Sequence, residues 1–202
     1  MKLKKIGVYI DAFDPIHSGN INFAERALNL LNLDVLYFLV EPTPRYKQGV
    51  KALDHRINMT ILAIADIPKF GTIVPKKHAI IADYISIIQS RFSDNELCII
   101  IPDSSLKQFF RLPNLLNLDL KKTEIVVGLN NQTEDEVNLR LSLLRDTSGL
   151  KFKYSSFKAK LPNIRTADLK KQILKGNKPI EMQKKVYDYI IKQGLYVATS
   201  KA

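Results

Sequence analysis

A short apolar strand, a turn and a helix follow one another at the start of the chain, and this order constrains the fold more than any other feature. Residues 6–10 form an apolar run of strand length, and Pro15 and Gly19 mark a turn after it. The helix expected over residues 20–31 repeats apolar side chains on one face. In an open α/β sheet the first such loop often lies where strand order reverses, beside a ligand crevice. We therefore expect the functional site at this loop.

Strand-length apolar runs and amphipathic helical segments continue to alternate along the chain. Residues 34–40 and 96–102 are nearly all apolar, as expected for parallel strands that are covered on both faces. Strands separated by helices favour right-handed crossovers and a parallel sheet. The sequence predicts an α/β fold, a Rossmann-like doubly wound parallel sheet with helices on both faces and a C-terminal helical segment. The other expected strands are 71–74, 123–128 and 150–154, and the other expected helices are 53–66, 80–91, 104–110, 133–146, 168–174 and 180–193, with a short helix or turn at 113–120.

The length of 202 residues and the hydrophobic content of 46% suffice for one buried core. We expect a single domain over residues 1–202, with the Rossmann-like core in 1–160 and the helical segment in 161–202. The one cysteine, Cys98, lies inside an apolar strand, which favours a structural thiol in the reducing cytoplasm. No apolar stretch approaches the ~20 residues that span a bilayer, so no membrane contact is expected.

The net charge of +11 is concentrated near the carboxyl end. Residues 151–202 hold thirteen lysines and arginines against three acidic residues, which leaves eighteen against seventeen in the rest of the chain. A basic segment attracts a polyanion such as nucleic acid, or supplies cations to the phosphates of a nucleotide. A solvated, lysine-rich helical face explains the same composition, and the alternatives stay open.

The loop 13–20 carries the first candidate site. Pro15 fixes one backbone dihedral, and Gly19 permits close approach or a positive φ. The free N–H groups at the start of the next helix suit an anion, and His17 is placed to donate to a phosphate oxygen. The alternative is a plain turn in which His17 only caps the helix.

The stretch Phe13–Asn20 resembles the His-x-Gly-His loop of nucleotidyltransferases, most closely that of the bacterial nicotinate/nicotinamide mononucleotide adenylyltransferase family. In that family the strand and loop look like Gly-Gly-Thr-Phe-Asp-Pro-Ile-His-x-Gly-His. The resemblance extends over about the full domain. Its further motifs are Pro42–Lys47 (similar to Pro-Pro-His-Lys), 54–59 (His-Arg-Leu-x-Met), 96–106 (a strand followed by Gly-Ala-Asp-Ala-Leu), 164–170 (Ile-Ser-Ser-Thr-x-Ile-Arg) and the closing helix 186–196.

This resemblance implies an enzyme that transfers the adenylyl group of ATP to nicotinate or nicotinamide mononucleotide, a step of NAD biosynthesis that releases pyrophosphate. ATP and Mg²⁺ are the implied cofactors and small-molecule nucleotides the implied partners, while self-association into a homo-oligomer stays open. Such sites work mainly by positioning and electrostatic stabilisation. The resemblance implies a catalytic set of His17, Asn20, Arg165 and Lys170, an ATP-binding set of Tyr9, Ile10, Asp11, Phe13, Asp14, Gly19, Asp103, Ile164 and Thr166, and a substrate-binding set of Arg45, Lys47 and Ser104, with no protein ligand to a metal.

Several positions depart from the family's motifs. Asn20 replaces the second histidine and cannot carry its charge. Ile10 and Asp11 replace the paired glycines, and their side chains are expected to crowd a nucleotide and to repel its phosphates. Pro102 and Ser104 replace a glycine and an aspartate, and the missing carboxylate has a substitute in the neighbouring Asp103.

Two departures near the carboxyl end supply cations. Arg165 offers a fork of donors that suits phosphate oxygens, and Lys170 keeps a positive charge where the family has arginine. Both also fit a basic surface, as Arg45 and Lys47 fit a solvated loop. The replaced residues leave an alternative function open, a relative that binds a nucleotide or a partner without turnover. A nucleic-acid-binding protein is the less favoured alternative, because the basic segment lacks interleaved stacking aromatics.

Overall fold

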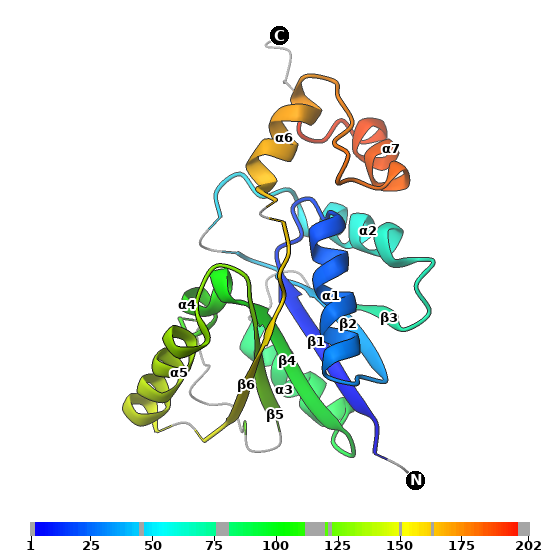
Figure 1. Cartoon of the computed structure of the whole chain (residues 1–202). Helices are drawn as coiled ribbons and strands as arrows, with labels where there is room; N and C mark the ends of the chain where they lie inside the picture. Colours follow the sequence, from blue (N-terminus) through cyan, green and yellow to red (C-terminus); the bar gives the residue numbers. More distant parts are fainter. Residues whose placement is uncertain are drawn as a thin grey trace.

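Six strands form one parallel sheet in the order β3-β2-β1-β4-β5-β6 (Figure 1). The structure is a computed structural model that describes residues 3–44, 47–75, 81–111, 120, 123–149, 151–162 and 164–197. The strands are β1 (Lys5–Asp11), β2 (Val35–Val40), β3 (Phe70–Ile73), β4 (Glu96–Pro102), β5 (Thr123–Leu129) and β6 (Lys153–Lys158). The helices are α1 (Ser18–Leu30), α2 (Leu53–Ile64), α3 (Ile81–Arg91), α4 (Leu106–Phe109), α5 (Glu134–Ser148), α6 (Thr166–Leu174) and α7 (Lys184–Lys192), with a 3₁₀ turn η1 (Asp103–Ser105).

Helices cover both faces of the sheet, because successive side chains of a strand point to opposite faces. In β1, Tyr9 lies in the apolar cluster that packs under α1, α2 and α7, whereas Ile10 lies in the cluster under α3, α4 and α5. The chain therefore winds both ways from β1, and the predicted Rossmann-like, doubly wound parallel sheet is confirmed. None of the described helices is long and apolar enough to cross a membrane.

The C-terminal helical segment lies beyond the carboxyl ends of the strands, beside α2 (Figure 1). Val186 and Ile190 of α7 are buried in the same cluster as Ile57 and Ala63 of α2. At the start of α7, the Gln183 Nε2 donates to the backbone oxygen of Ala63 at 3.0 Å. The segment is thus fixed to the sheet domain by both apolar packing and a hydrogen bond.

Several predicted elements have different bounds in the structure. The strand predicted at 150–154 is β6, which pairs with β5 from Lys153 to Lys158. β6 is an edge strand with mostly exposed or half-buried side chains, so an apolar run does not mark it. The helix predicted at 180–193 begins only at Lys184, after the extended residue Gln183.

Smaller differences concern three other predicted helices. The one predicted at 104–110 is the turn η1 followed by the four residues of α4. The helices predicted to begin at 20 and 168 begin earlier, at Ser18 and Thr166. The short helix or turn predicted at 113–120 lies outside the described residues, apart from Leu120.

A buried guanidinium joins the loops at the carboxyl edge of the sheet. Arg56 of α2 is 1% exposed and donates to four backbone oxygens. Its Nη1 reaches Ala12 O at 2.9 Å and Glu41 O at 2.7 Å, its Nη2 reaches Pro42 O at 3.0 Å, and its Nε reaches Lys51 O at 2.9 Å. The loops after β1 and β2 are therefore held by one side chain.

The substitution Arg56→Lys tests how much these loops depend on the guanidinium. A lysine ammonium cannot reproduce the planar fork, so buried carbonyl oxygens lose their donors and the free energy of unfolding is expected to fall by about 3 kcal/mol. Urea denaturation followed by circular dichroism measures the loss. The control is Arg140→Lys on the exposed side of α5, and a loss for Arg56→Lys as small as that of the control would contradict this role.

Candidate functional site

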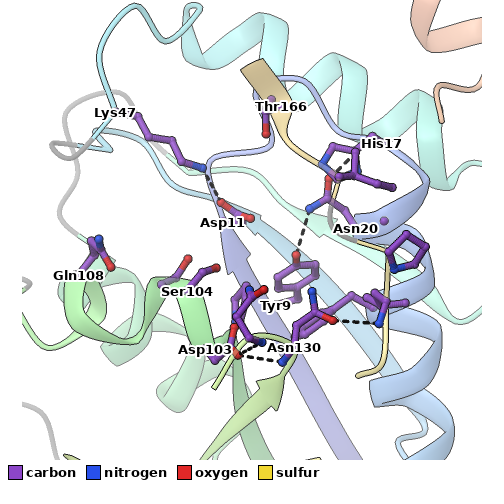
Figure 2. A pocket seen from close by; sticks show the side chains of 18 residues that line it. Tyr9, Asp11, His17, Asn20, Lys47, Asp103, Ser104, Gln108, Asn130 and Thr166 are labelled. Atoms are coloured by element: carbon purple, nitrogen blue, oxygen red, sulfur yellow. Dashed lines mark hydrogen bonds and ion pairs between the residues drawn. The ribbon is translucent and has the colours of Figure 1, made fainter. Parts of the chain in front are cut away.

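A cleft of about 460 Å³ opens at the carboxyl ends of β1, β4 and β5, where the order of the sheet reverses (Figure 2). β1 and β4 are neighbours, but the crossovers from them run in opposite directions along the sheet. The loops that follow these strands therefore diverge and leave a crevice, which is where doubly wound sheets bind ligands. The cleft is lined by Tyr9, Asp11, His17, Gly19, Asn20, Phe23, Lys47, Pro102, Asp103, Ser104, Ser105, Gln108, Asn130, Asn131, Leu161, Pro162, Ile164 and Thr166.

The loop between β1 and α1 places His17 against the first turn of the helix. His17 is the extended N-cap residue of α1, and its backbone N–H donates to the Asn20 Oδ1 at 3.1 Å. Gly19 lets the imidazole lie close to the backbone, because a Cβ there would come within 3.0 Å of both the His17 ring and the Ile164 side chain. The predicted need for glycine at this position thus has a steric cause.

The imidazole of His17 is neutral at pH 7. Burial lowers the pKa of His17 to about 4, an effect that the nearby Asp11 carboxylate opposes and Lys47 reinforces. Within the described part of the chain, the buried Nδ1 has no hydrogen-bond partner. The residue lines the cleft, and a neutral imidazole has one nitrogen that donates and one that accepts.

Asp11 and Lys47 form an ion pair at the edge of the cleft. The Asp11 Oδ1 accepts from the Lys47 Nζ at 3.0 Å and from the Ala12 N–H at 2.6 Å, as Figure 2 shows for the lysine. The Asp11 side chain is 14% exposed and the Lys47 side chain is 38% exposed. The carboxylate that the sequence predicts to repel phosphate is therefore largely neutralised by a cation from the next loop.

Asp103 organises the opposite wall of the cleft. Its Oδ2 accepts from the backbone N–H groups of Asn130, Asn131 and Gln132 at 2.8, 2.6 and 2.8 Å. The Asp103 carboxylate therefore fixes the turn between β5 and α5. Its Oδ1 is buried and has no partner among the described residues.

Asp14 lies behind the loop and binds the C-terminal segment. Its carboxylate accepts from the Lys170 ammonium of α6 and from the hydroxyl of Tyr196, and its Oδ1 also accepts from the backbone N–H of Lys51 at 3.2 Å. The Asp14 side chain is 2% exposed. Burial next to this carboxylate raises the pKa of Tyr196 far above its usual value.

The cleft brings together most, but not all, of the residues predicted from the sequence. Ten of them line it, namely Tyr9, Asp11, His17, Gly19, Asn20, Lys47, Asp103, Ser104, Ile164 and Thr166. Ile10 and Phe13 are buried in the two apolar clusters and do not line the cleft. Three other predicted residues do not line the cleft, namely Asp14, Arg165 and Lys170. Lys170 is paired with Asp14. Arg165 is 70% exposed and is paired with Asp168 at 2.7 Å. Arg45 lies outside the described residues.

Part of the wall of the cleft is formed by residues that were not predicted from the sequence. The residues not singled out are Phe23, Ser105, Gln108, Asn130, Asn131, Leu161 and Pro162. Asn130 and Asn131 follow β5 directly, and polar residues at the carboxyl end of a parallel strand are a recognisable signal. Leu161 comes into place because its N–H donates to the Asn130 Oδ1 at 2.9 Å, a contact that sequence spacing does not indicate.

The arrangement suits a phosphorylated ligand. Gly19 and Asn20 in the first turn of α1, and Thr166 at the start of α6, all line the cleft, so two helix N-termini face the same space. The fold and this cleft together define an α/β protein with a doubly wound parallel sheet and a candidate phosphate-binding cleft at its switch point.

Comparisons with known proteins agree with this class and narrow it. The profile of the cytidylyltransferase-like family matches residues 8–172, and the chain belongs to that family. It is 26% identical to a probable nicotinate-nucleotide adenylyltransferase of Dictyoglomus thermophilum over 202 residues, 96% of this chain and 100% of the relative. It is 30% identical to the nicotinate-nucleotide adenylyltransferase of Bacillus subtilis over 125 residues, 57% of this chain and 66% of the relative.

A solved structure shares the fold. The Plasmodium falciparum nicotinic acid mononucleotide adenylyltransferase complexed with NaAD superposes with a TM-score of 0.74 at 17% identity, covering 96% of this chain and 97% of that one. The resemblance to the nicotinate mononucleotide adenylyltransferases that the motifs indicate is confirmed by these relatives.

The pH dependence of stability tests the environment of His17. The unfolded chain binds a proton at His17 below pH 6.5, whereas the folded protein binds it only below about 4, so the free energy of unfolding falls as the pH drops between these values. Relative to the His17→Asn variant, the wild type is expected to lose about 2 kcal/mol more between pH 7 and pH 4.5. Urea denaturation at both pH values measures this difference, and parallel losses in the two proteins would show that burial does not suppress the charge.

Proposed function

We propose that this chain transfers the adenylyl group of ATP to nicotinate or nicotinamide mononucleotide. A phosphate oxygen of the mononucleotide attacks the α-phosphorus of ATP, a new phosphoanhydride bond forms, and the bond from the α-phosphorus to the β-phosphate oxygen breaks. The products are a dinucleotide and pyrophosphate. The names of the similar proteins, nicotinate-nucleotide adenylyltransferases, support the nicotinate acceptor, and the chemistry of the cleft supports the reaction.

The observation that carries the proposal is the position of His17 on the N-terminal turn of α1 at the switch point of the sheet. The neutral imidazole offers a hydrogen bond to a phosphate oxygen, and the N–H groups of the helix add fixed partial positive charge. Negative charge that develops around the phosphorus is stabilised by groups already in place. Positioning and preorganised donors then provide the catalysis, without a covalent enzyme intermediate.

Magnesium enters this proposal as part of the substrate Mg·ATP. Among the described residues, no group of three or more His, Cys, Asp or Glu side chains could hold a metal ion. Mg²⁺ keeps several waters and binds through substrate phosphates, so it needs no protein cage. The lining donors fit the triphosphate, and the ion pair with Lys47 reduces the repulsion from Asp11.

Nucleotide binding without turnover is a second candidate, favoured by one specific observation. Asp11 engages the Lys47 cation in the cleft, so this cation is already paired where two phosphorylated substrates would have to be held together. A cleft that tolerates one nucleotide beside the Asp11–Lys47 pair need not tolerate a second one. Product formation distinguishes the two candidates.

The proposal predicts pyrophosphate release that depends on His17. Mg·ATP is supplied with nicotinate mononucleotide or nicotinamide mononucleotide, and pyrophosphate and dinucleotide are measured together. His17→Ala is expected to lower kcat/KM by about 100-fold, as removal of one preorganised donor does elsewhere. His55→Ala is the control, since His55 bonds to Tyr189 on α7 and does not line the cleft.

Two results would contradict the proposal in different ways. Turnover that is the same in wild type and His17→Ala would exclude this cleft as the site. Binding of Mg·ATP by calorimetry with neither mononucleotide converted over hours would favour the second candidate.

A further inference from the structure

Tyr9 presents a hydroxyl group to the cleft from a rigid position. The residue is 1% exposed, and its ring packs on those of Phe13, Phe23 and Phe38 with centroid distances of 5.1, 4.8 and 5.5 Å. These contacts hold the ring, and with it the hydroxyl oxygen, in one position. Figure 2 shows the hydroxyl directed at Asn20, between the two walls of the cleft.

The polarity of the hydrogen bond between Tyr9 and Asn20 is fixed by a third group. The backbone N–H of His17 is a donor only, so the Asn20 oxygen must face it, and does so at 3.1 Å. The Asn20 Nδ2 is thereby turned toward Tyr9 and donates to its phenolic oxygen at 3.1 Å. Tyr9 is the acceptor in this pair.

The hydroxyl proton of Tyr9 is consequently not used in the hydrogen bond with Asn20. A phenol has one proton to donate, and within the described residues no acceptor takes it. Asp11, the nearest carboxylate along β1, accepts from Ala12 and Lys47 through its Oδ1, and the hydrogen bond given for the Tyr9 hydroxyl is the one from Asn20. Burial and the charge of Asp11 raise the pKa of Tyr9 well above 10, so the proton stays on the phenol at neutral pH.

We propose that Tyr9 is a further catalytic residue of this cleft, which donates its unused O–H hydrogen bond to an anionic phosphate oxygen of the bound nucleotide. No covalent bond forms or breaks at Tyr9, and its proton stays in place. The identity of the nucleotide as Mg·ATP rests on the proposed function. The donor itself follows from the hydrogen bonds of Tyr9, Asn20 and His17.

A neutral donor suits this position. The Lys47 cation is engaged by Asp11 and the imidazole of His17 is uncharged, so dipolar groups supply much of the attraction for phosphate. Asn20 strengthens the phenol as a donor, because a hydroxyl that accepts a hydrogen bond polarises its own O–H. Tyr9 and Asn20 thus act as one relay of hydrogen bonds that ends at the ligand.

Tyr9→Phe removes the hydroxyl and leaves the ring. We expect affinity for Mg·ATP, measured by calorimetry, or kcat/KM for dinucleotide formation to fall about 10-fold or more. Tyr37→Phe is the matched control, because Tyr37 on β2 stacks on Phe92 in the other apolar cluster and does not line the cleft. Circular dichroism confirms that both variants are folded.

Asn20→Asp tests the direction of the relay. A carboxylate can still accept from the His17 N–H, but its second oxygen accepts the Tyr9 proton and withdraws it from the cleft. In the Asn20→Asp background, the added change Tyr9→Phe is therefore expected to have less than about a twofold further effect. The same change in wild type keeps its full effect.

Three results would overturn this role. The first is that Tyr9→Phe keeps its affinity for Mg·ATP and its turnover within about twofold of wild type. The second is that Tyr9→Phe has equal effects in the wild-type and Asn20→Asp backgrounds. The third is that the wild type does not bind Mg·ATP. If wild type binds Mg·ATP but makes no dinucleotide, the proposed reaction fails, and the calorimetric effect of Tyr9→Phe still decides whether the phenol binds the nucleotide.

Discussion

The buried carboxylate of Asp14 is the interaction on which the arrangement of the site depends. It joins the loop after β1 to Lys51, to Lys170 on α6 and to Tyr196 beyond α7. A buried carboxylate that lost these donors would be strongly destabilising, so the three segments are held to the loop together. The C-terminal segment is therefore part of the structure that positions His17, although its helices are far from β1 in sequence.

Ion pairs of the same kind explain why the cations among the described residues add little net positive charge to the cleft. Lys170 neutralises Asp14, Lys47 neutralises Asp11, and Arg165 pairs with Asp168 at the surface. These three cations, which the resemblance assigns to the nucleotide site, are thus engaged with carboxylates of this chain. The donors that remain toward the cleft are mostly dipoles, fixed by backbone and ring packing, and preorganised dipoles lose little by reorganisation when a charged ligand binds.

Much of the fold could be predicted from the sequence, because apolar periodicity and the alternation of strands with helices determine a doubly wound sheet. His17, Gly19 and Thr166 could be placed near one another because the loop after β1 and the start of α6 carry recognisable motifs. The side on which Ile10 lies also follows from strand geometry, since Tyr9 and Asp11 share one face and Ile10 must take the other. The partner of Lys170 could not be predicted, because Asp14 lies 156 residues away and only the tertiary fold joins them.

Asn20 shows how one substitution in a motif changes both the charge and the hydrogen bonds of the site. Considered alone, an asparagine in place of a histidine removes a charge from the cleft. In the structure, the Asn20 Oδ1 accepts from the His17 N–H and the Asn20 Nδ2 donates to the Tyr9 hydroxyl. The amide therefore orients both the N-cap of α1 and a phenol of β1. A histidine ring at this position has no carbonyl oxygen, and as an imidazolium it could not accept from the His17 N–H. The loss of charge at Asn20 and the gain of a directed phenol at Tyr9 are therefore two consequences of the same residue.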